Sequence, residues 1–141
     1  MPFKLNIGQK GKSWKLETDA EYLAGKSIGA TIEGKEITQE LEDYTFEITG
    51  GSDHAGFPLS KNVEGIGLKR LLLTRGWGMH EKTKGLRRRK TTRGKIIAST
   101  TTQINLKVIK EGKKPLEEIF PDQNKPKEKQ AEQKAQETPA Q

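Results

Sequence analysis

The chain has 141 residues, a formal net charge of +7 and no cysteine, and only 30% of its residues are hydrophobic. This length allows one small domain with extensions, and the lack of cysteine excludes a disulfide framework, a thiolate metal site and a cysteine nucleophile. No apolar stretch approaches the roughly 20 residues of a membrane-spanning helix, and the first residues lack the apolar region of a signal peptide. We therefore expect a soluble, cytoplasmic protein with a small core and no membrane partner.

Four segments in the first 50 residues alternate between apolar and polar side chains, as strands with one buried face do. Glycines and short polar runs between these segments indicate turns. Residues 19–23 are predicted to form a single helical turn. The apolar sides of the four predicted strands are Phe3, Leu5 and Ile7; Trp14 and Leu16; Ile28, Ala30 and Ile32; and Tyr44, Phe46 and Ile48.

Residues 50–58 contain three glycines and a proline, so we predict a structured loop in which glycines adopt positive φ and Asp53 bonds to the backbone. Ser52, Asp53 and His54 are the residue types of a hydrolase triad, but neighbours in an extended chain point apart and cannot relay a proton. His80 is the only other histidine, which leaves little material for a metal site. We expect no enzyme activity, cofactor or small-molecule substrate, with a small hydrolase using His54 or His80 as the competing hypothesis.

Three more strands are predicted at residues 69–75, 96–98 and 103–109, from short apolar or alternating runs. Six or seven short strands with glycine-rich turns favour a mostly β protein, a small closed or half-closed β-barrel, with a β-sandwich as the alternative. Residues 1–110 are assigned to this domain. Residues 111–141 are expected to form an extended or disordered tail, because large hydrophobic residues become scarce in this region and none follows Phe120.

Residues 69–95, called the basic segment below, hold eleven of the 26 lysines and arginines and a single acid, Glu81. So dense a block of like charge repels itself and cannot be buried in protein. It suits a polyanion, and nucleic acid is the common polyanion with regularly spaced phosphates. A nuclear-import-like signal and a solvated charged loop remain as alternatives, the latter weakened by the lack of interleaved acids.

Arginine forks bind phosphate through two hydrogen bonds and stack on bases, so the arginines of the basic segment are the leading candidates for RNA contacts. The hydroxyls of Thr91 and Thr92 can donate to phosphates, and Gly85 and Gly94 would allow a ligand to approach the backbone. Trp77, between two glycines, either stacks on an unpaired base or caps the core. The candidate contacts are Lys69, Arg70, Arg75, Trp77, Lys82, Lys84, Arg87, Arg88, Arg89, Lys90, Thr91, Arg93 and Lys95.

Four motifs of the chain, in this order and spacing, resemble the ribosomal protein S6e family of archaeal and eukaryotic small subunits. They are Gly50-Gly51-Ser52-Asp53-His54-Ala55-Gly56-Phe57-Pro58, Arg70-Leu71-Leu72-Leu73, Arg87-Arg88-Arg89-Lys90-Thr91-Thr92-Arg93-Gly94 and Ile104-Asn105-Leu106. The resemblance covers roughly residues 2–110. His54 and Ala55 stand where the family more usually has Lys-Gln, and the long basic extension with phosphorylatable serines of eukaryotic members is lacking, so the chain resembles the short archaeal form.

The resemblance implies a small β-barrel that binds small-subunit ribosomal RNA, contacts neighbouring ribosomal proteins and has no catalytic activity. It places residues 50–58 and 82–94 near the RNA, which adds Gly51 and Ser52 to the candidate contacts. The expected function is that of a structural constituent of the small ribosomal subunit, supporting translation. The alternative is a free nucleic-acid-binding protein, such as an RNA chaperone or a chromatin-like protein.

Overall fold

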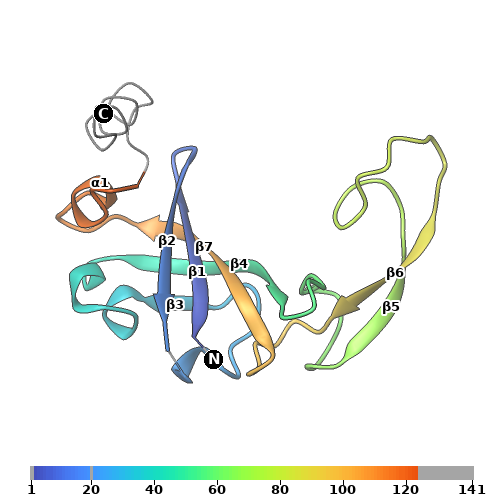
Figure 1. Ribbon diagram of the computed structural model, residues 1–141, viewed down its shortest axis with the longest axis horizontal. Helices are drawn as coiled ribbons and strands as arrows, with labels where there is room; N and C mark the ends of the chain where they lie inside the picture. The colour runs from blue at the N-terminus through green and yellow to red at the C-terminus, as the bar shows by residue number, and fades with distance from the viewer. Residues whose placement is uncertain (1, 20, 124–141) are drawn as a thin grey trace, which may run out of the picture.

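Strands dominate the computed structural model, which describes residues 2–19 and 21–123 (Figure 1). In this described part, seven strands form a five-stranded sheet of order β2-β1-β7-β4-β3 and a separate two-stranded sheet of β5 and β6. The prediction of a mostly β protein is confirmed. The strands are β1 (Phe3–Gln9), β2 (Lys12–Thr18), β3 (Thr31–Glu33), β4 (Thr45–Asp53), β5 (Leu68–Leu73), β6 (Arg88–Arg93) and β7 (Thr101–Lys110).

The centre of the larger sheet is formed by strands from opposite ends of the described chain. β1 pairs in parallel with β7 and antiparallel with β2, while β4 pairs antiparallel with β7 and β3. The register sets Ile7 opposite Leu106 in β7 and opposite Trp14 in β2, and all three side chains are buried. Alternation in three strands therefore builds one continuous apolar face, as the sequence predicts.

The expected closed or half-closed barrel is not confirmed, because the strands of the described residues form two separate sheets and the outer strands β2 and β3 do not pair with each other. β3 is only three residues long, and the backbone before it turns at Gly29, whose φ is +89°. Ile97 is also buried in the core, yet the predicted strand around it is a loop with one isolated bridge between Ser27 and Ile96. In the stretch before β3 and around Ile97, the apolar pattern reflects burial and not strand pairing.

Short 3-10 helices cover the apolar face of the sheet. They are η1 (Glu21–Leu23), which corresponds to the predicted helical turn, η2 (Gly34–Glu36) and η3 (Gln39–Leu41). Leu23 and Leu41 are fully buried, and the rings of Tyr44 and Phe46 stack with centroids 5.8 Å apart. The described helices include none that is long and apolar enough to cross a bilayer.

The segment after β7 packs back onto the sheet, so the boundary of the tail lies later than the sequence suggests. Leu116, in the short helix α1 (Leu116–Ile119), is buried, and Tyr44 donates a hydrogen bond to the carbonyl of Lys114. The amide side chain of Gln123 accepts from the Lys15 N–H at 2.6 Å and donates to the Lys15 carbonyl at 2.8 Å, so it occupies the open edge of β2 as a neighbouring strand would. Residues 124–141 lie outside the described part.

Candidate nucleic-acid interface

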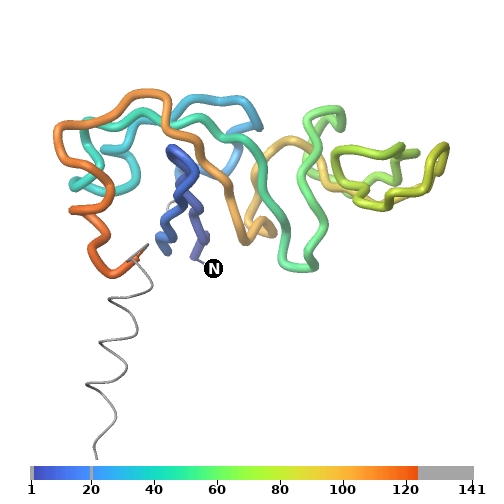
Figure 2. The backbone as a smooth tube through the Cα atoms, turned by 90° about the horizontal axis from the view of Figure 1, so that it is seen from above, coloured from blue at the N-terminus to red at the C-terminus, as the bar shows by residue number. Residues whose placement is uncertain are grey.

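Strands β5 and β6 and the loop between them, together called the ribbon, contain the basic segment except for Gly94 and Lys95. The ribbon projects from one end of the larger sheet (Figures 1 and 2). The two strands pair antiparallel from Leu68 opposite Arg93 to Leu73 opposite Arg88. The sequence did not predict β6, because Arg88–Arg93 lacks apolar alternation. Its extended form follows from pairing with β5 and from the full burial of Thr92, whose hydroxyl donates to the Lys69 carbonyl at 3.3 Å.

A buried ion pair joins the ribbon to the larger sheet. Arg93 Nε donates to Asp53 Oδ2 at 2.7 Å, and the two side chains are 11% and 0% exposed. The other carboxylate oxygen accepts the N–H groups of Ala55 at 3.0 Å and Phe57 at 2.8 Å, which confirms the predicted backbone-bonding role of Asp53. Burial raises the pKa of the Asp53 carboxyl, but the hydrogen bonds from Arg93, Phe57 and Ala55 outweigh it, so the pKa lies below its ordinary value.

Two of the predicted RNA contacts, Arg93 and Lys95, serve this junction. The Arg93 backbone donates to the Pro58 carbonyl and accepts from the Ser60 N–H, each at 2.9 Å, and Lys95 Nζ lies 2.9 Å from a carboxylate oxygen of Glu64. An isolated two-stranded hairpin is marginally stable in water. The structure therefore uses Arg93 and Lys95 to hold the ribbon. No local pattern reveals this, because Asp53 and Glu64 lie 40 and 31 residues away in sequence.

Gly94 allows the backbone at the base of the ribbon to come close to the protein's own chain. A Cβ at this position would lie 1.9 Å from the Gly65 carbonyl oxygen. The idea that Gly94 makes room for a ligand is therefore wrong, since the space is taken by protein backbone. Gly85, in contrast, has a φ of +77° in the connecting loop, where a Cβ would meet nothing within 4 Å.

We expect Gly94→Ala to lower the free energy of unfolding by about 1–3 kcal/mol, since the backbone must move to relieve the overlap. Gly67→Ala is the matched control, because a Cβ there meets nothing within 4 Å and Gly67 has no positive φ. Urea unfolding of both variants measures the difference. Equal stability of the two would contradict the role given to Gly94.

Gly51 and Ser52 lie within β4, so the predicted loop begins only after Asp53. A Cβ on Gly51 would lie 2.4 Å from the Gln103 carbonyl oxygen of the neighbouring strand β7. Glycine is needed at position 51 because β4 and β7 come so close there, and not because of a positive φ. In residues 50–58 the glycine with a positive φ is Gly56, at +89°. Ser52 is half-buried and bridges to Pro58.

Trp77 stands at the corner of a tight turn in the loop of the ribbon. The N–H of Met79 bonds to the Gly76 carbonyl at 3.1 Å, the reverse bond is 3.2 Å, and Gly78 has the positive φ (+73°) that the third position of a type II turn needs. Met79 is buried under this turn, whereas the indole of Trp77 is 53% exposed. The alternative in which Trp77 caps the core is wrong, and the turn presents its ring to solvent.

Positive charge without acidic partners is concentrated on the ribbon. Three basic side chains of the segment form ion pairs: Arg93 and Lys95 as described, and Arg88 with Glu81 at 2.8 Å. Thr91 is half-buried beside them. Within residues 2–19 and 21–123, no ion pair involves the other eight basic side chains of the segment. Lys90 is half-buried and the other seven are exposed. The eight are Lys69, Arg70, Arg75, Lys82, Lys84, Arg87, Arg89 and Lys90.

Two residues named in the competing hydrolase hypothesis have structural contacts. Asp53 is held by Arg93, and His54 Nδ1 lies 3.4 Å from the Thr100 carbonyl, directed at backbone. Within the described ranges no group of three or more histidine, cysteine, aspartate or glutamate side chains could hold a metal ion.

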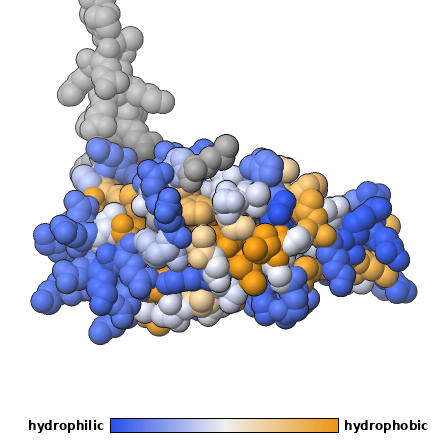
Figure 3. Space-filling model, turned by 90° about the horizontal axis from the view of Figure 1, so that it is seen from below, coloured by the Kyte–Doolittle hydropathy of each residue, from blue (hydrophilic) through white to orange (hydrophobic). Residues whose placement is uncertain are grey.

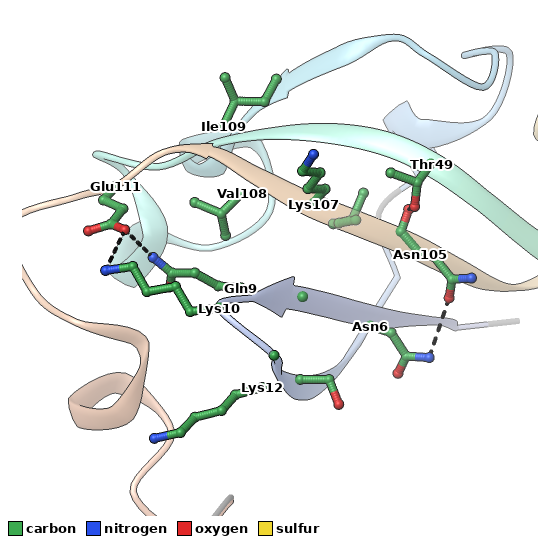
Figure 4. Close-up of a pocket in the computed structure, with 14 residues that line it drawn as sticks. Asn6, Gln9, Lys10, Lys12, Thr49, Asn105, Lys107, Val108, Ile109 and Glu111 are labelled. Carbon is green, nitrogen blue, oxygen red and sulfur yellow. Dashed lines mark hydrogen bonds and ion pairs between the residues drawn. The ribbon is translucent and has the colours of Figure 1, made fainter.

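An open hollow of about 640 Å³ lies on the polar face of the larger sheet, beside the β1–β2 turn (Figure 4). Its side chains bond to one another: Glu111 lies 3.2 Å from Lys10 and accepts from Gln9 at 2.6 Å, and Asn6 donates to Asn105 at 3.4 Å. Most charges in this hollow are therefore compensated, Lys12 by Glu117 as well, and of its charged residues only Lys107 has no ion pair within the described ranges.

Comparison with known proteins agrees with the motifs. The family model for ribosomal protein S6e matches residues 3–121. A small ribosomal subunit protein eS6 from Methanococcus maripaludis strain C7 is 44% identical over 118 residues, 82% of this chain and 94% of the relative. The protein of the same name from Archaeoglobus fulgidus is 48% identical over 102 residues (72% and 78%), and that from Methanothermobacter thermautotrophicus is 43% identical over 123 residues (85% and 96%). With a matched model over most of its length and relatives of this similarity, the chain belongs to the ribosomal protein S6e family, whose members are structural proteins and not enzymes.

Proposed function

We propose that this protein is a structural constituent of the small ribosomal subunit in the cytoplasm and that it binds ribosomal RNA through the ribbon. The observation that carries the proposal is a set of eight basic side chains on a projecting, anchored hairpin, none of which has an ion-pair partner in the part of the chain that the structure describes. The names of the relatives, which are small-subunit ribosomal proteins, support the choice of RNA. Neighbouring ribosomal proteins are proposed as further partners of the larger sheet.

In this proposal the basic side chains replace the cations that surround RNA phosphates, and the release of those cations drives binding. The larger sheet acts as a rigid base, because the Asp53–Arg93 pair fixes where the ribbon leaves it. Anchoring lowers the ordering cost that a free basic loop would face on binding. Arg93 and Lys95 contribute by holding the ribbon, and the eight unpaired residues meet phosphates.

Binding of the full chain to small-subunit ribosomal RNA should weaken steeply with salt. About six phosphate contacts give a slope of log affinity against log salt of about −4 to −5. Competition with duplex DNA separates this proposal from a free nucleic-acid-binding protein, since a ribosomal constituent should prefer the structured RNA. A slope near zero would overturn RNA binding by the ribbon, and equal affinity for DNA would favour the free binder.

Trp77→Ala is expected to weaken RNA binding by about 1–3 kcal/mol, the usual contribution of one base stacked on an aromatic ring. Because the indole is largely exposed, the free energy of unfolding should change by less than about 0.5 kcal/mol. Trp77→Phe serves as the control, since a phenyl ring can still stack. If Trp77→Ala unfolds easily but binds RNA normally, the side chain supports the loop and does not contact RNA.

A further inference from the structure

The ribbon and the residues just before it expose large hydrophobic side chains beside the positive charges. Six large hydrophobic residues are exposed in the described part of the chain, and four of them fall between residues 66 and 77. They are Ile66 (47%), Leu68 (51%), Leu72 (56%) and Trp77 (53%). Phosphate attraction explains the basic residues but gives no reason to expose leucines, so this surface has a second requirement.

The strand register gathers these leucines on one face. Residues directly opposite each other in an antiparallel pair share a face, as do residues two apart in one strand. Leu68, Arg70 and Leu72 of β5 therefore lie on the same face as Arg93, Thr91 and Arg89 of β6. Arg93, opposite Leu68, is held by Asp53, and the other five residues are called the Leu/Arg face. Leu72 pairs directly with Arg89, and Arg70 with Thr91.

The opposite face of the ribbon is already partly covered. Leu71, Leu73 and Lys90 are half-buried there, and Thr92 is fully buried. The Leu/Arg face is the more open side, because Leu68, Arg70, Leu72 and Arg89 are exposed and only Thr91 is half-buried. The acid nearest to this face, Asp53, is buried and already paired with Arg93. Figure 3 shows hydrophobic and hydrophilic surface mixed at the end of the molecule that carries the ribbon.

The chemistry of the Leu/Arg face fits a helix of RNA. The minor groove of an RNA duplex is wide and shallow, with riboses on its floor and phosphates along its rims, whereas the major groove is too deep and narrow for side chains to read. Two strands about 4.8 Å apart form a thin, twisted element that can follow such a groove. Leucines 68 and 72, roughly 13 Å apart along the strand, would meet the carbon-rich sides of riboses.

We propose that the Leu/Arg face lies in the minor groove of an RNA duplex, with Leu68 and Leu72 packed on riboses and Arg70 and Arg89 on the flanking phosphates. The inference rests on the proposed function and adds to it the form of the RNA and the face that binds. Apolar packing supplies a part of the affinity that salt does not screen, since leucines release no counterions.

The test compares the full chain with Leu68→Ser/Leu72→Ser for binding to a short RNA duplex, to its single strand and to a DNA duplex of the same sequence. The double variant is expected to lose roughly ten-fold in affinity for the RNA duplex, with an unchanged salt slope. The wild-type protein should prefer the RNA duplex to the other two probes. Ile109→Ser, equally exposed on the larger sheet, is the control and should bind as the wild type does.

Several outcomes would overturn the inference. Unchanged RNA binding by the double variant would mean that the leucines face another partner, such as an acidic, apolar segment of a neighbouring protein. An equal loss for single-stranded RNA would exclude the minor groove. Either result leaves the proposed function standing as long as wild-type binding falls steeply with salt. Leu68→Ala/Leu72→Ala, checked by circular dichroism, repeats the test without adding polar groups.

Discussion

Replacing Arg87, Arg88 and Arg89 together with alanine should weaken binding to small-subunit ribosomal RNA by roughly 100-fold or more, while the protein stays folded. Hydrogen bonds to charged groups typically contribute about 1.5 kcal/mol or more each, so loss of the phosphate contacts of Arg87 and Arg89 alone reaches this size. Arg87 and Arg89 have no ion-pair partner in residues 2–19 and 21–123, and the Arg88–Glu81 pair is mostly exposed and so contributes little to stability.

A salt titration shows whether these arginines act through phosphates. The slope of log affinity against log salt should become less steep by about 2–3 units, close to one per lost contact. Lys107→Ala/Lys110→Ala/Lys113→Ala removes the same charge from an exposed region away from the ribbon and is the matched control. Equal losses in both triple variants would mean that overall charge, and not the ribbon, governs binding. Loss of the circular dichroism spectrum in the arginine variant would make these residues structural.

Asp53→Ala is expected to destabilise the protein by about 3–5 kcal/mol, the usual consequence of leaving one member of a buried ion pair without its partner. The substitution leaves the Arg93 guanidinium without its carboxylate partner, although the Arg93 side chain is only 11% exposed. It also leaves the N–H groups of Ala55 and Phe57 without their acceptor. Urea unfolding measures the loss. Asp53→Ala/Arg93→Met should recover part of it, because no charge remains buried. A double variant as unstable as the single one would contradict the ion-pair account.

The contribution of Asp53 should depend on pH in a definite direction. Its pKa is lowered in the folded protein, so the folded state favours the ionised carboxyl. The stabilisation is therefore complete above the unfolded-state pKa of about 3.9 and is lost as pH falls through the lower folded-state pKa. The gap in stability between the wild type and Asp53→Ala should stay constant from neutral pH to about pH 5 and shrink below about pH 4. A gap that stays constant down to pH 2 would show that the carboxylate charge does not matter.

Local alternation predicts most of the larger sheet. β1, β2, β4 and β7 each carry apolar side chains at every second position, and that pattern reports directly on a sheet with one buried face. It fails where burial and strand pairing separate: Ile97 is buried in a loop, and β6 is a strand with hardly any buried side chain. Local alternation also cannot predict whether the sheet closes into a barrel, because pairing between the edge strands depends on segments far apart in the sequence.

The positive charge of the candidate interface can be predicted from the sequence, but the role of each basic residue within it cannot. Density of lysine and arginine marks the whole basic segment. Whether a given residue meets RNA or holds the ribbon depends on partners far along the chain, as Arg93 depends on Asp53. The Leu/Arg face cannot be predicted from the sequence either. Leu72 belongs to the predicted strand 69–75 and Leu68 precedes it, but only the structure shows that both are exposed and that the register of β5 with β6 places them on one face.

Cosedimentation of the tagged protein with ribosomal particles on sucrose gradients, at low and high salt and with mapping of crosslinked RNA, tests the central claim most directly. The account predicts residence on the small subunit, release at high salt, and crosslinks concentrated in residues 69–95. Migration at the top of the gradient at low salt, or crosslinks confined to the larger sheet, would contradict it.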